Sequence, residues 1–257
     1  MRAVRKRYGD SFTMAGRCLL LSVRNPDTFL TSIVLPLIMM LLFVSLFGSF
    51  IQVEGISYVD YIVPGVLLQC FGQCSSVTAI FVNRDVSSGM MNRFSVLPIR
   101  KSAVLTGHIL EAMVRNFLAV GTVLLAALFM GFRPSANGGD WCVLILLLAG
   151  AALAFSWLAV AIGGAAGSPE GASGLFTFAI VLPYLSSGFV PAEAMPRPLG
   201  IFAQYQPMTP MINAMRNALL GKPLEEKTLL SALLWCVGLT AVFYILSVKV
   251  FQKRLSR

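Results

Sequence analysis

The chain has 257 residues, of which 57% are hydrophobic and only 12% are charged. Soluble domains carry about 25% charged residues, so this composition excludes a water-soluble globule, which would lack the polar side chains to cover its surface. It also excludes a disordered chain, because disorder requires low hydrophobicity and high charge. A mean hydropathy of +0.79 therefore predicts an integral membrane protein.

The net charge of +9 and the scarcity of metal-binding residues narrow the functional classes further. In a soluble chain this charge would suggest nucleic-acid binding, but in a membrane chain it indicates which side of the bilayer a segment occupies. We therefore expect no nucleic-acid partner. The five cysteines are scattered without a C-x-x-C pair, and the only histidine is His108. A disulfide framework and a histidine-based metal centre are not expected.

Six charge-poor stretches are long enough to cross a bilayer, which takes about 20 apolar residues in a helix. They lack the alternation of a membrane β-strand, so each is predicted to be a helix. The predicted spans cover residues 29–53, 61–82, 109–132, 141–166, 171–191 and 228–248. The sequence thus predicts an all-α membrane protein in which residues 1–257 form one transmembrane domain.

Lysine and arginine concentrate on one side of these spans. Residues 1–28 contain six, residues 83–107 contain four and the tail after residue 248 contains four, whereas residues 54–60 contain none. Because cytoplasmic segments of membrane proteins carry the excess of Lys and Arg, both termini are predicted to be cytoplasmic. The even number of spans agrees with this orientation.

Residues 1–28 are too often interrupted by charge to form a cleavable signal peptide, whose central region is apolar. Within residues 10–26, apolar side chains would gather on one side of a helix: Phe12, Met14, Ala15, Leu19 and Val23. This pattern predicts a helix lying along the cytoplasmic interface before the first span. The alternative is a solvated basic tail.

The loop over residues 83–107 carries a second amphipathic pattern. Asp85 and Ser87 are candidate helix N-caps, and Pro98 would end the helix. The other side chains assigned to this helix are Met90, Met91, Arg93, Phe94 and Leu97. An exposed apolar face on a connecting loop needs a partner surface, so we expect a cytoplasmic protein to dock here. The alternative is a helix that rests on the bilayer.

Residues 192–226 are long for a loop and only partly polar. Residues 198–215 carry no charge yet contain three prolines, and so broken a segment cannot span lipid, where freed backbone groups stay unpaired. We expect an extracellular re-entrant pair of short helices before the last span; the alternative is a segment that lies on the membrane surface. The candidate gate residues are Met195, Pro196, Gln204, Pro207, Thr209 and Arg216.

Two further polar groups fall near or within the spans. Glu111 and Arg115 have i,i+4 spacing and can pair on one helix face. His108 and Glu111 also have an H-x-x-E spacing, but a single such pair is weak evidence for a metal site. We therefore predict that His108, Glu111 and Arg115 form an interfacial polar cluster. On the second span, the candidate residues lining a transport path are Gln69, Gln73, Ser75 and Ser76.

Several motifs of chemistry are absent from the sequence. There is no G-x-x-x-x-G-K-[ST] loop, so no ATP site is expected. There is no G-x-S-x-G elbow or H-E-x-x-H helix either. We therefore expect that the chain is not an enzyme and binds no cofactor, and that any transport draws its energy from another polypeptide.

The order and spacing of several short motifs resemble the ABC-2 family of ABC-transporter permeases, and within it the daunorubicin-resistance type. The resemblance covers about residues 25–225. The stretches that carry it are Leu46-Phe47-Gly48, Tyr61-Ile62-Val63-Pro64-Gly65, Asn83-Arg84-Asp85, Arg93-Phe94, Leu97-Pro98-Ile99, Gly131-Phe132-Arg133-Pro134, Phe189-Val190-Pro191, Met195-Pro196, Pro207, Thr209 and Arg216.

This resemblance implies a half-transporter in a bacterial plasma membrane. Two six-helix permeases, identical or homologous, would face each other above two ATPase subunits that bind ATP and Mg²⁺. Residues 83–98 would be the coupling helix that seats on the ATPase. Residues 10–26 would resemble the family's interfacial connecting helix, and residues 192–217 its extracellular hairpin.

The function that the resemblance implies is export of amphipathic small molecules, either drugs or lipid-like compounds. Apolar, Met-containing spans favour such cargo, because they suit varied apolar substrates. The alternative with the same fold is export of a polysaccharide or teichoic-acid chain on a lipid carrier. A membrane-embedded enzyme would need clustered His, Asp or Glu at bilayer depth, which this sequence lacks. A non-transporting sensing or assembly subunit is a third alternative.

Overall fold

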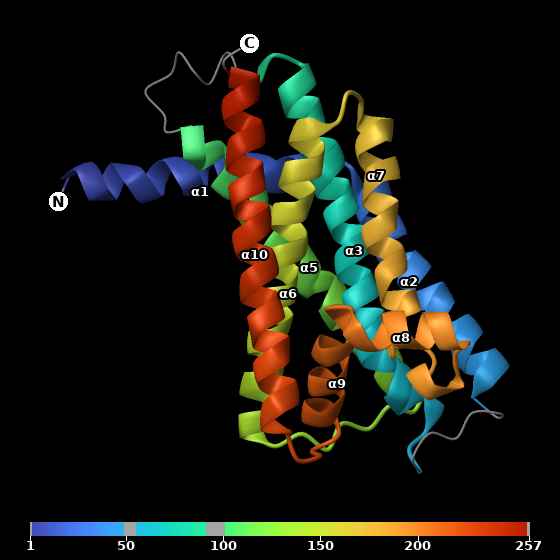
Figure 1. Ribbon diagram of the computed structural model, residues 1–257. Helices are drawn as coiled ribbons and strands as arrows, with labels where there is room; N and C mark the ends of the chain where they lie inside the picture. The colour runs from blue at the N-terminus through green and yellow to red at the C-terminus, as the bar shows by residue number, and fades with distance from the viewer. Residues whose placement is uncertain (1, 49–54, 91–100, 256–257) are drawn as a thin grey trace.

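A computed structural model describes residues 2–48, 55–90 and 101–255 of the chain. Every regular element of these residues is helical, which confirms the all-α fold (Figure 1). The long helices are α1 (Arg2–Val23), α2 (Pro26–Phe47), α3 (Tyr58–Ser87), α5 (Lys101–Phe129), α6 (Gly138–Ala165) and α10 (Glu226–Leu255). The shorter ones are α7 (Pro169–Val181), η1 (Leu182–Leu185), η2 (Ala192–Ala194), α8 (Arg197–Tyr205) and α9 (Met208–Leu219).

Five helices of the described residues are long and apolar enough to cross a membrane, namely α2, α3, α5, α6 and α10. They correspond to five of the six predicted spans. The remaining predicted span, 171–191, is shorter than expected because α7 ends at Val181 and a 3-10 turn follows. Pro183 lies in that turn, and a proline disfavours helical geometry in the residue before it and removes a backbone donor.

Helix α3 is the centre of the bundle. It packs against α2, α5, α6, α7 and α9, and 89% of its span is buried, compared with 11% for α10. Its apolar residues surround the whole helix, and Ile62, Leu67 and Phe71 are fully buried. A helix that is apolar all round needs neighbours on every side, so α3 takes the core position.

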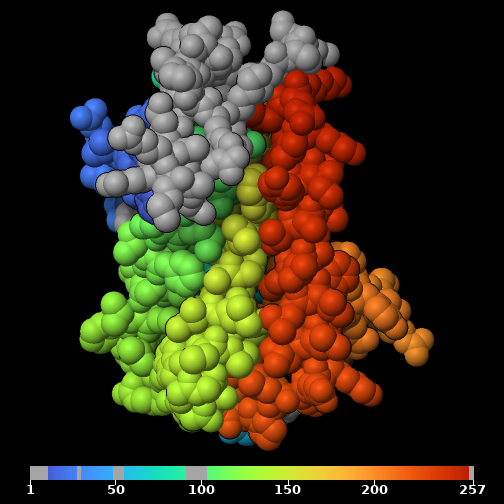
Figure 2. Space-filling view, turned by 90° about the vertical axis from the view of Figure 1, so that its left-hand side faces the viewer, coloured from blue at the N-terminus to red at the C-terminus, as the bar shows by residue number. Residues whose placement is uncertain are grey.

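Helix α10 lies at the edge of the bundle. Figure 2 shows it as a ridge along one face, with α6 visible only as a strip between α10 and α5. Small residues allow α6 to approach it closely: a Cβ atom at Gly150 would lie 3.0 Å from the Cβ of Cys236. The outer side of α10 is apolar, with Leu234 and Val237 exposed, as expected of a surface that meets lipid.

Helix α1 crosses one end of the bundle at a steep angle to the long helices, and the end of α10 lies at this same end (Figure 1). We call it the α1 end. Met14 and Ala15 are buried against α5, whereas Phe12 and Val23 are exposed. Residues 10–23 of the segment predicted over 10–26 are therefore helical, whereas Pro26 already begins α2. The apolar side chains divide between the bundle and the outside, and a position along the interface stays a prediction.

Helices α8 and α9 form a hairpin near the opposite end of the bundle (Figure 1). We call this the hairpin end. Gln206 ends α8 with an extended backbone, and α9 begins directly after Pro207. Pro210 occupies the first turn of α9, where a helix tolerates proline. Two short helices thus lie within 192–226, separated at 206–207, and that they re-enter the membrane from the extracellular side stays a prediction.

Candidate functional site

Asp85, in the last turn of α3, is the centre of a polar cluster at the α1 end. Both Arg17 terminal nitrogens donate to its carboxylate, each at 2.8 Å. This two-pronged geometry is the strong form of an arginine–carboxylate pair. Hydrogen bonding to Asp85 raises the pKa of Arg17 above its already high value, so the guanidinium stays charged.

His108 of α5 completes this cluster. Its Nε2 lies 3.1 Å from Asp85 Oδ2, and its Nδ1 lies 3.7 Å from Cys18 Sγ of α1. His108 is 1% exposed and Asp85 6%. We call Arg17, Cys18, Asp85 and His108 the Asp85 cluster; it joins α1, α3 and α5 through three buried side chains and the half-buried Arg17.

Asn83, one half-turn before Asp85, connects α3 to the turn between α6 and α7. Its side-chain amide donates to the carbonyls of Gly163 at 3.0 Å and Ala166 at 2.8 Å. Arg254 of α10 donates to the Gly164 carbonyl from the other side at 3.1 Å. These bonds satisfy carbonyls at the end of α6 that have no partner within the helix.

Glu111 and Arg115 form an ion pair deeper in the bundle. Arg115 donates to Glu111 at 2.6 Å and to Thr78 of α3 at 2.8 Å. The Glu111 side chain is 0% exposed and that of Arg115 is 2%. Buried charges are stable only when paired and hydrogen-bonded, and this pair links α5 to α3.

At the hairpin end, Arg216 of α9 is the main polar anchor. It donates to the Tyr61 carbonyl at 3.1 Å, to the Ser187 carbonyl at 2.8 Å and to Asn213 Oδ1 at 2.7 Å. Its guanidinium carbon also lies 3.8 Å above the centre of the Tyr61 ring. Arg216 is only 8% exposed, so it fastens α9 to α3 and to the segment after η1.

A glycine contact holds that segment against α3. A Cβ atom at Gly65 would lie 2.8 Å from the Gly188 carbonyl oxygen, so only glycine permits this approach. The Tyr61 hydroxyl donates to the Ser187 carbonyl at 2.6 Å, and the Tyr58 hydroxyl donates to the Phe189 carbonyl at 2.9 Å. The start of α3 thus fixes residues 187–189.

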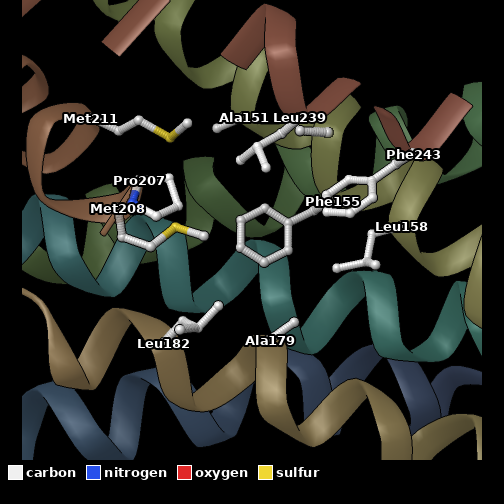
Figure 3. A pocket seen from close by; sticks show the side chains of 11 residues that line it. Ala151, Phe155, Leu158, Ala179, Leu182, Pro207, Met208, Met211, Leu239 and Phe243 are labelled. Carbon is white, nitrogen blue, oxygen red and sulfur yellow. The ribbon is translucent and has the colours of Figure 1, made fainter. Parts of the chain in front are cut away.

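Two cavities adjoin the hairpin. The larger one, about 940 Å³, opens at the hairpin end and is lined by both polar and apolar side chains, including Arg216, Asn213, Glu193 and Glu225. The smaller one, about 70 Å³, is entirely apolar (Figure 3). Drug-sized ligands occupy pockets of about 300–1,000 Å³, so only the larger cavity has room for one.

Figure 3 shows how the smaller cavity is built. Phe155 of α6 and Phe243 of α10 close one side, and Met208 and Met211 of α9 close the other. The hairpin therefore rests on the apolar surface between α6 and α10 through flexible methionine side chains, which fill irregular gaps.

Residues 10–220 of the chain match the family model described as "ABC-2 type transporter". The chain belongs to this family. It is 29% identical over 234 residues to the daunorubicin resistance ABC transporter permease protein DrrB1 of Streptomyces coeruleorubidus, covering 89% of this chain and 81% of the relative. It is 27% identical over 247 residues to a probable doxorubicin resistance ABC transporter permease protein, DrrC, of Mycobacterium tuberculosis, covering 93% of this chain and 87% of the relative.

Within this ABC-2 type transporter, the loop predicted over 83–107 begins later than expected. Asp85 and Ser87 are not N-caps of a new helix but belong to α3, and the Ser87 hydroxyl donates back to the Asn83 carbonyl at 2.7 Å. The α3 helix continues because Asn83 and Asp85 find partners in neighbouring helices. Met90 is half-buried at the edge of the described residues. The predicted residues Met91, Arg93, Phe94, Leu97 and Pro98 lie outside them.

The polar cluster predicted for His108, Glu111 and Arg115 divides into two groups. The Glu111–Arg115 pair forms as its i,i+4 spacing predicts, whereas His108 turns to Asp85. All three are buried within the bundle. No group of metal-ligating side chains occurs within the residues that the structure describes.

Three of the four candidate path residues point into the bundle. Gln69 and Ser75 are 0% exposed, and Ser76 is 6% exposed; Gln69 donates to the Tyr184 hydroxyl. Gln73 is half-buried. Gln69 therefore links α3 to η1, and Gln73 is the most exposed of the four residues.

The predicted gate residues occupy different environments in the hairpin. Gln204 and Pro196 are exposed, and Met195 and Pro207 are half-buried. Thr209 is buried, accepts a hydrogen bond from the Ser187 amide at 3.3 Å and donates to the Ala203 carbonyl. Arg216 points inward, because the carbonyls of Tyr61 and Ser187 accept its hydrogen bonds.

Proposed function

We propose that this chain is the permease subunit of an ATP-driven exporter that moves amphipathic, drug-like small molecules out of the cell. The observation that carries the proposal is the family match over residues 10–220, joined to relatives named as drug-resistance permeases that align along most of their length. These names favour drug-like cargo over a lipid-linked glycan.

The chain would work with an ABC ATPase, as its family implies. We propose two ATPase subunits and a second copy of the permease, or a homologous one. ATP and Mg²⁺ would bind to the ATPase, and no residue of this chain is assigned to them. Residues 83–98 would dock on the ATPase, with the apolar side chains from Met90 onward on the contacting face.

We propose six crossings of the plasma membrane, of which α7 with η1 is the shortest. The 13 residues of α7 rise about 20 Å, which is less than the roughly 30 Å of hydrocarbon. An even number is supported by the position of α1 and the end of α10 at the same end of the bundle (Figure 1). That end would be cytoplasmic, since it carries most of the Lys and Arg.

The hairpin of α8 and α9 would lie on the outer side and dip into the membrane. Its exposed side chains include Ile201, Phe202 and Tyr205, which tolerate lipid. The hydrogen bonds of Arg216 and Thr209 satisfy the broken backbone around it, as non-helical segments at membrane depth require. We propose that this hairpin controls release at the outer end of the path, which the large adjoining cavity supports.

The proposal is tested by ATP hydrolysis in a complex of the chain with the ABC ATPase that co-purifies with it. We expect doxorubicin to stimulate hydrolysis in lipid nanodiscs in a saturable manner. The ATPase alone is the control and is expected to show no stimulation. Stimulation by a lipid-linked glycan and not by doxorubicin would instead support the alternative cargo.

A further inference from the structure

The Asp85 cluster connects three helices that are distant in sequence. Arg17 and Asp85 are 68 residues apart, and Asp85 and His108 are 23 apart. Arg17 engages both oxygens of the carboxylate, while His108 shares one of them. Asp85 thus receives hydrogen bonds or charge contacts from α1 and α5 at once.

Helices α1 and α5 also pack closely at uncharged residues outside the Asp85 cluster. A Cβ atom at Gly107 would lie 2.8 Å from the Met14 Cβ, so the two backbones approach as nearly as glycine permits. The Thr106 hydroxyl lies 3.1 Å from that of Ser11. Packed contacts of this kind shift as a unit rather than deform gradually, so α1 and α5 would move together.

On its other side, the end of α3 holds the turn between α6 and α7 through Asn83. The last turn of α3 therefore has contacts with α1, with α5 and with the α6–α7 turn. Residues 83–87 of this turn also begin the segment 83–98 that the proposed function assigns to ATPase docking. A displacement of that segment would move the end of α3 directly, because residues 83–87 belong to both.

We propose that Asp85 is a positioning residue that makes α1 follow the end of α3 when the ATPase moves the docking segment. Arg17 transmits the displacement to α1, and His108 fixes the carboxylate on the α5 side. This inference rests on the proposed function. Asp85 belongs to the docking segment, but its buried carboxylate faces Arg17 and His108, whereas the proposed contacting face begins at Met90; Asp85 would therefore act as a connection within the permease.

The test measures how many molecules are exported for each ATP hydrolysed, with doxorubicin as the probe and the permease–ATPase complex in sealed proteoliposomes. The variants are Asp85→Asn, which keeps shape but removes charge, Asp85→Glu, which restores charge, and Arg17→Lys, which keeps charge but loses the two-pronged geometry. Matched controls are Arg24→Ala, directly after α1, and Lys227→Ala, at the start of α10; both residues are exposed and lie outside residues 83–98.

Coupling between two sites is typically worth about 5- to 150-fold, so we expect Asp85→Asn to lower the ratio of export to hydrolysis at least about fivefold. Asp85→Glu should recover part of the loss, and both controls should match the wild type. Arg17→Lys should lower the ratio as well, and it keeps the test decisive if Asp85→Asn does not fold. An unchanged ratio in both Asp85→Asn and Arg17→Lys would overturn the inference.

The reactivity of Cys18 supplies a second measurement, because this α1 residue faces His108 of α5 and is only 3% exposed. In a chain whose other four cysteines are replaced, Asp85→Asn should speed modification of Cys18 by a small thiol reagent. A reduced export ratio with Cys18 protected as in the wild type would overturn the inference, since α1 would not have been released. If the wild-type complex hydrolyses ATP but exports no doxorubicin, the proposed function fails, while the Cys18 measurement still tests the connection.

Discussion

At the scale of single residues, burial of charge explains most of the polar architecture. Asp85, His108, Glu111, Arg115 and Arg216 are all buried in the part of the chain that the structure describes, and each has a polar partner. An unpaired charge in such surroundings would cost several kcal/mol. These partners therefore fix how the helices sit against one another.

Sequence alone could predict only some of these pairs. The pairing of Glu111 with Arg115 was predictable, because helical spacing brings residues i and i+4 together. The pairing of Asp85 with Arg17 spans 68 residues and depends on how α1 crosses the bundle, which no local pattern encodes. Asp85 was consequently predicted to cap a loop helix, although the tertiary contact keeps it inside α3.

The buried Glu111–Arg115 pair gives a stability prediction. Glu111→Ala leaves the arginine charge buried without its partner, and loss of one partner of a buried pair costs about 3–5 kcal/mol. We expect a clear fall in the thermal unfolding midpoint of the purified protein. Replacing both residues by apolar ones of similar size should cost less than the single change.

Glu226→Ala is the matched control, because this glutamate is exposed at the start of α10. Its unfolding midpoint should stay close to that of the wild type. Equal midpoints for Glu111→Ala and Glu226→Ala would show that the buried pair contributes nothing to stability.

At the scale of elements, apolar length was the most reliable signal. Long uninterrupted apolar stretches of sequence predicted α2, α3, α5, α6 and α10, because a helix of that length crosses the bilayer with its backbone hydrogen bonds satisfied. The end of α7 was missed, since apolar composition continues past the point where Pro183 ends the helix. The hairpin was predictable from its prolines, but the inward direction of Arg216 was not.

Arg216 gives a prediction for the hairpin. Its bonds to the carbonyls of Tyr61 and Ser187 hold α9 against α3 and the segment after η1, and hydrogen bonds to a charged group are each worth about 1.5–3 kcal/mol. We expect Arg216→Ala to speed amide hydrogen exchange in α9 at least about tenfold, because local opening becomes easier. Mass spectrometry of peptides from 208–219 would measure this change.

The control for this experiment is Arg197→Ala, an exposed arginine at the start of α8. Exchange in α9 should be unaffected by it. If Arg216→Ala leaves the exchange of α9 at the rate of this control, the arginine does not anchor the hairpin.

At the scale of the whole molecule, the two ends of the bundle differ in kind. The α1 end holds α1, the Asp85 cluster and the end of α10, whereas the hairpin end holds α8, α9 and the large cavity. This division agrees with the proposed function, in which the ATPase binds at the α1 end and cargo is released at the hairpin end. Opposite ends should therefore face opposite compartments.

Topology can be tested with single cysteines in a background without the native ones. Glu193→Cys at the hairpin end should react with a membrane-impermeant thiol reagent in intact cells. Gln252→Cys near the end of α10 should react only after the membrane is permeabilised; both positions are exposed. Labelling of Gln252→Cys alone in intact cells would invert the orientation.

The central claim is that this chain exports drug-like molecules when an ATPase drives it. The most direct measurement is ATP-dependent accumulation of doxorubicin inside sealed proteoliposomes that hold the permease–ATPase complex with its ATPase facing outward. We expect accumulation that requires hydrolysable ATP and disappears when the permease is omitted. Equal doxorubicin uptake with and without the permease, in vesicles that hydrolyse ATP normally, would contradict it.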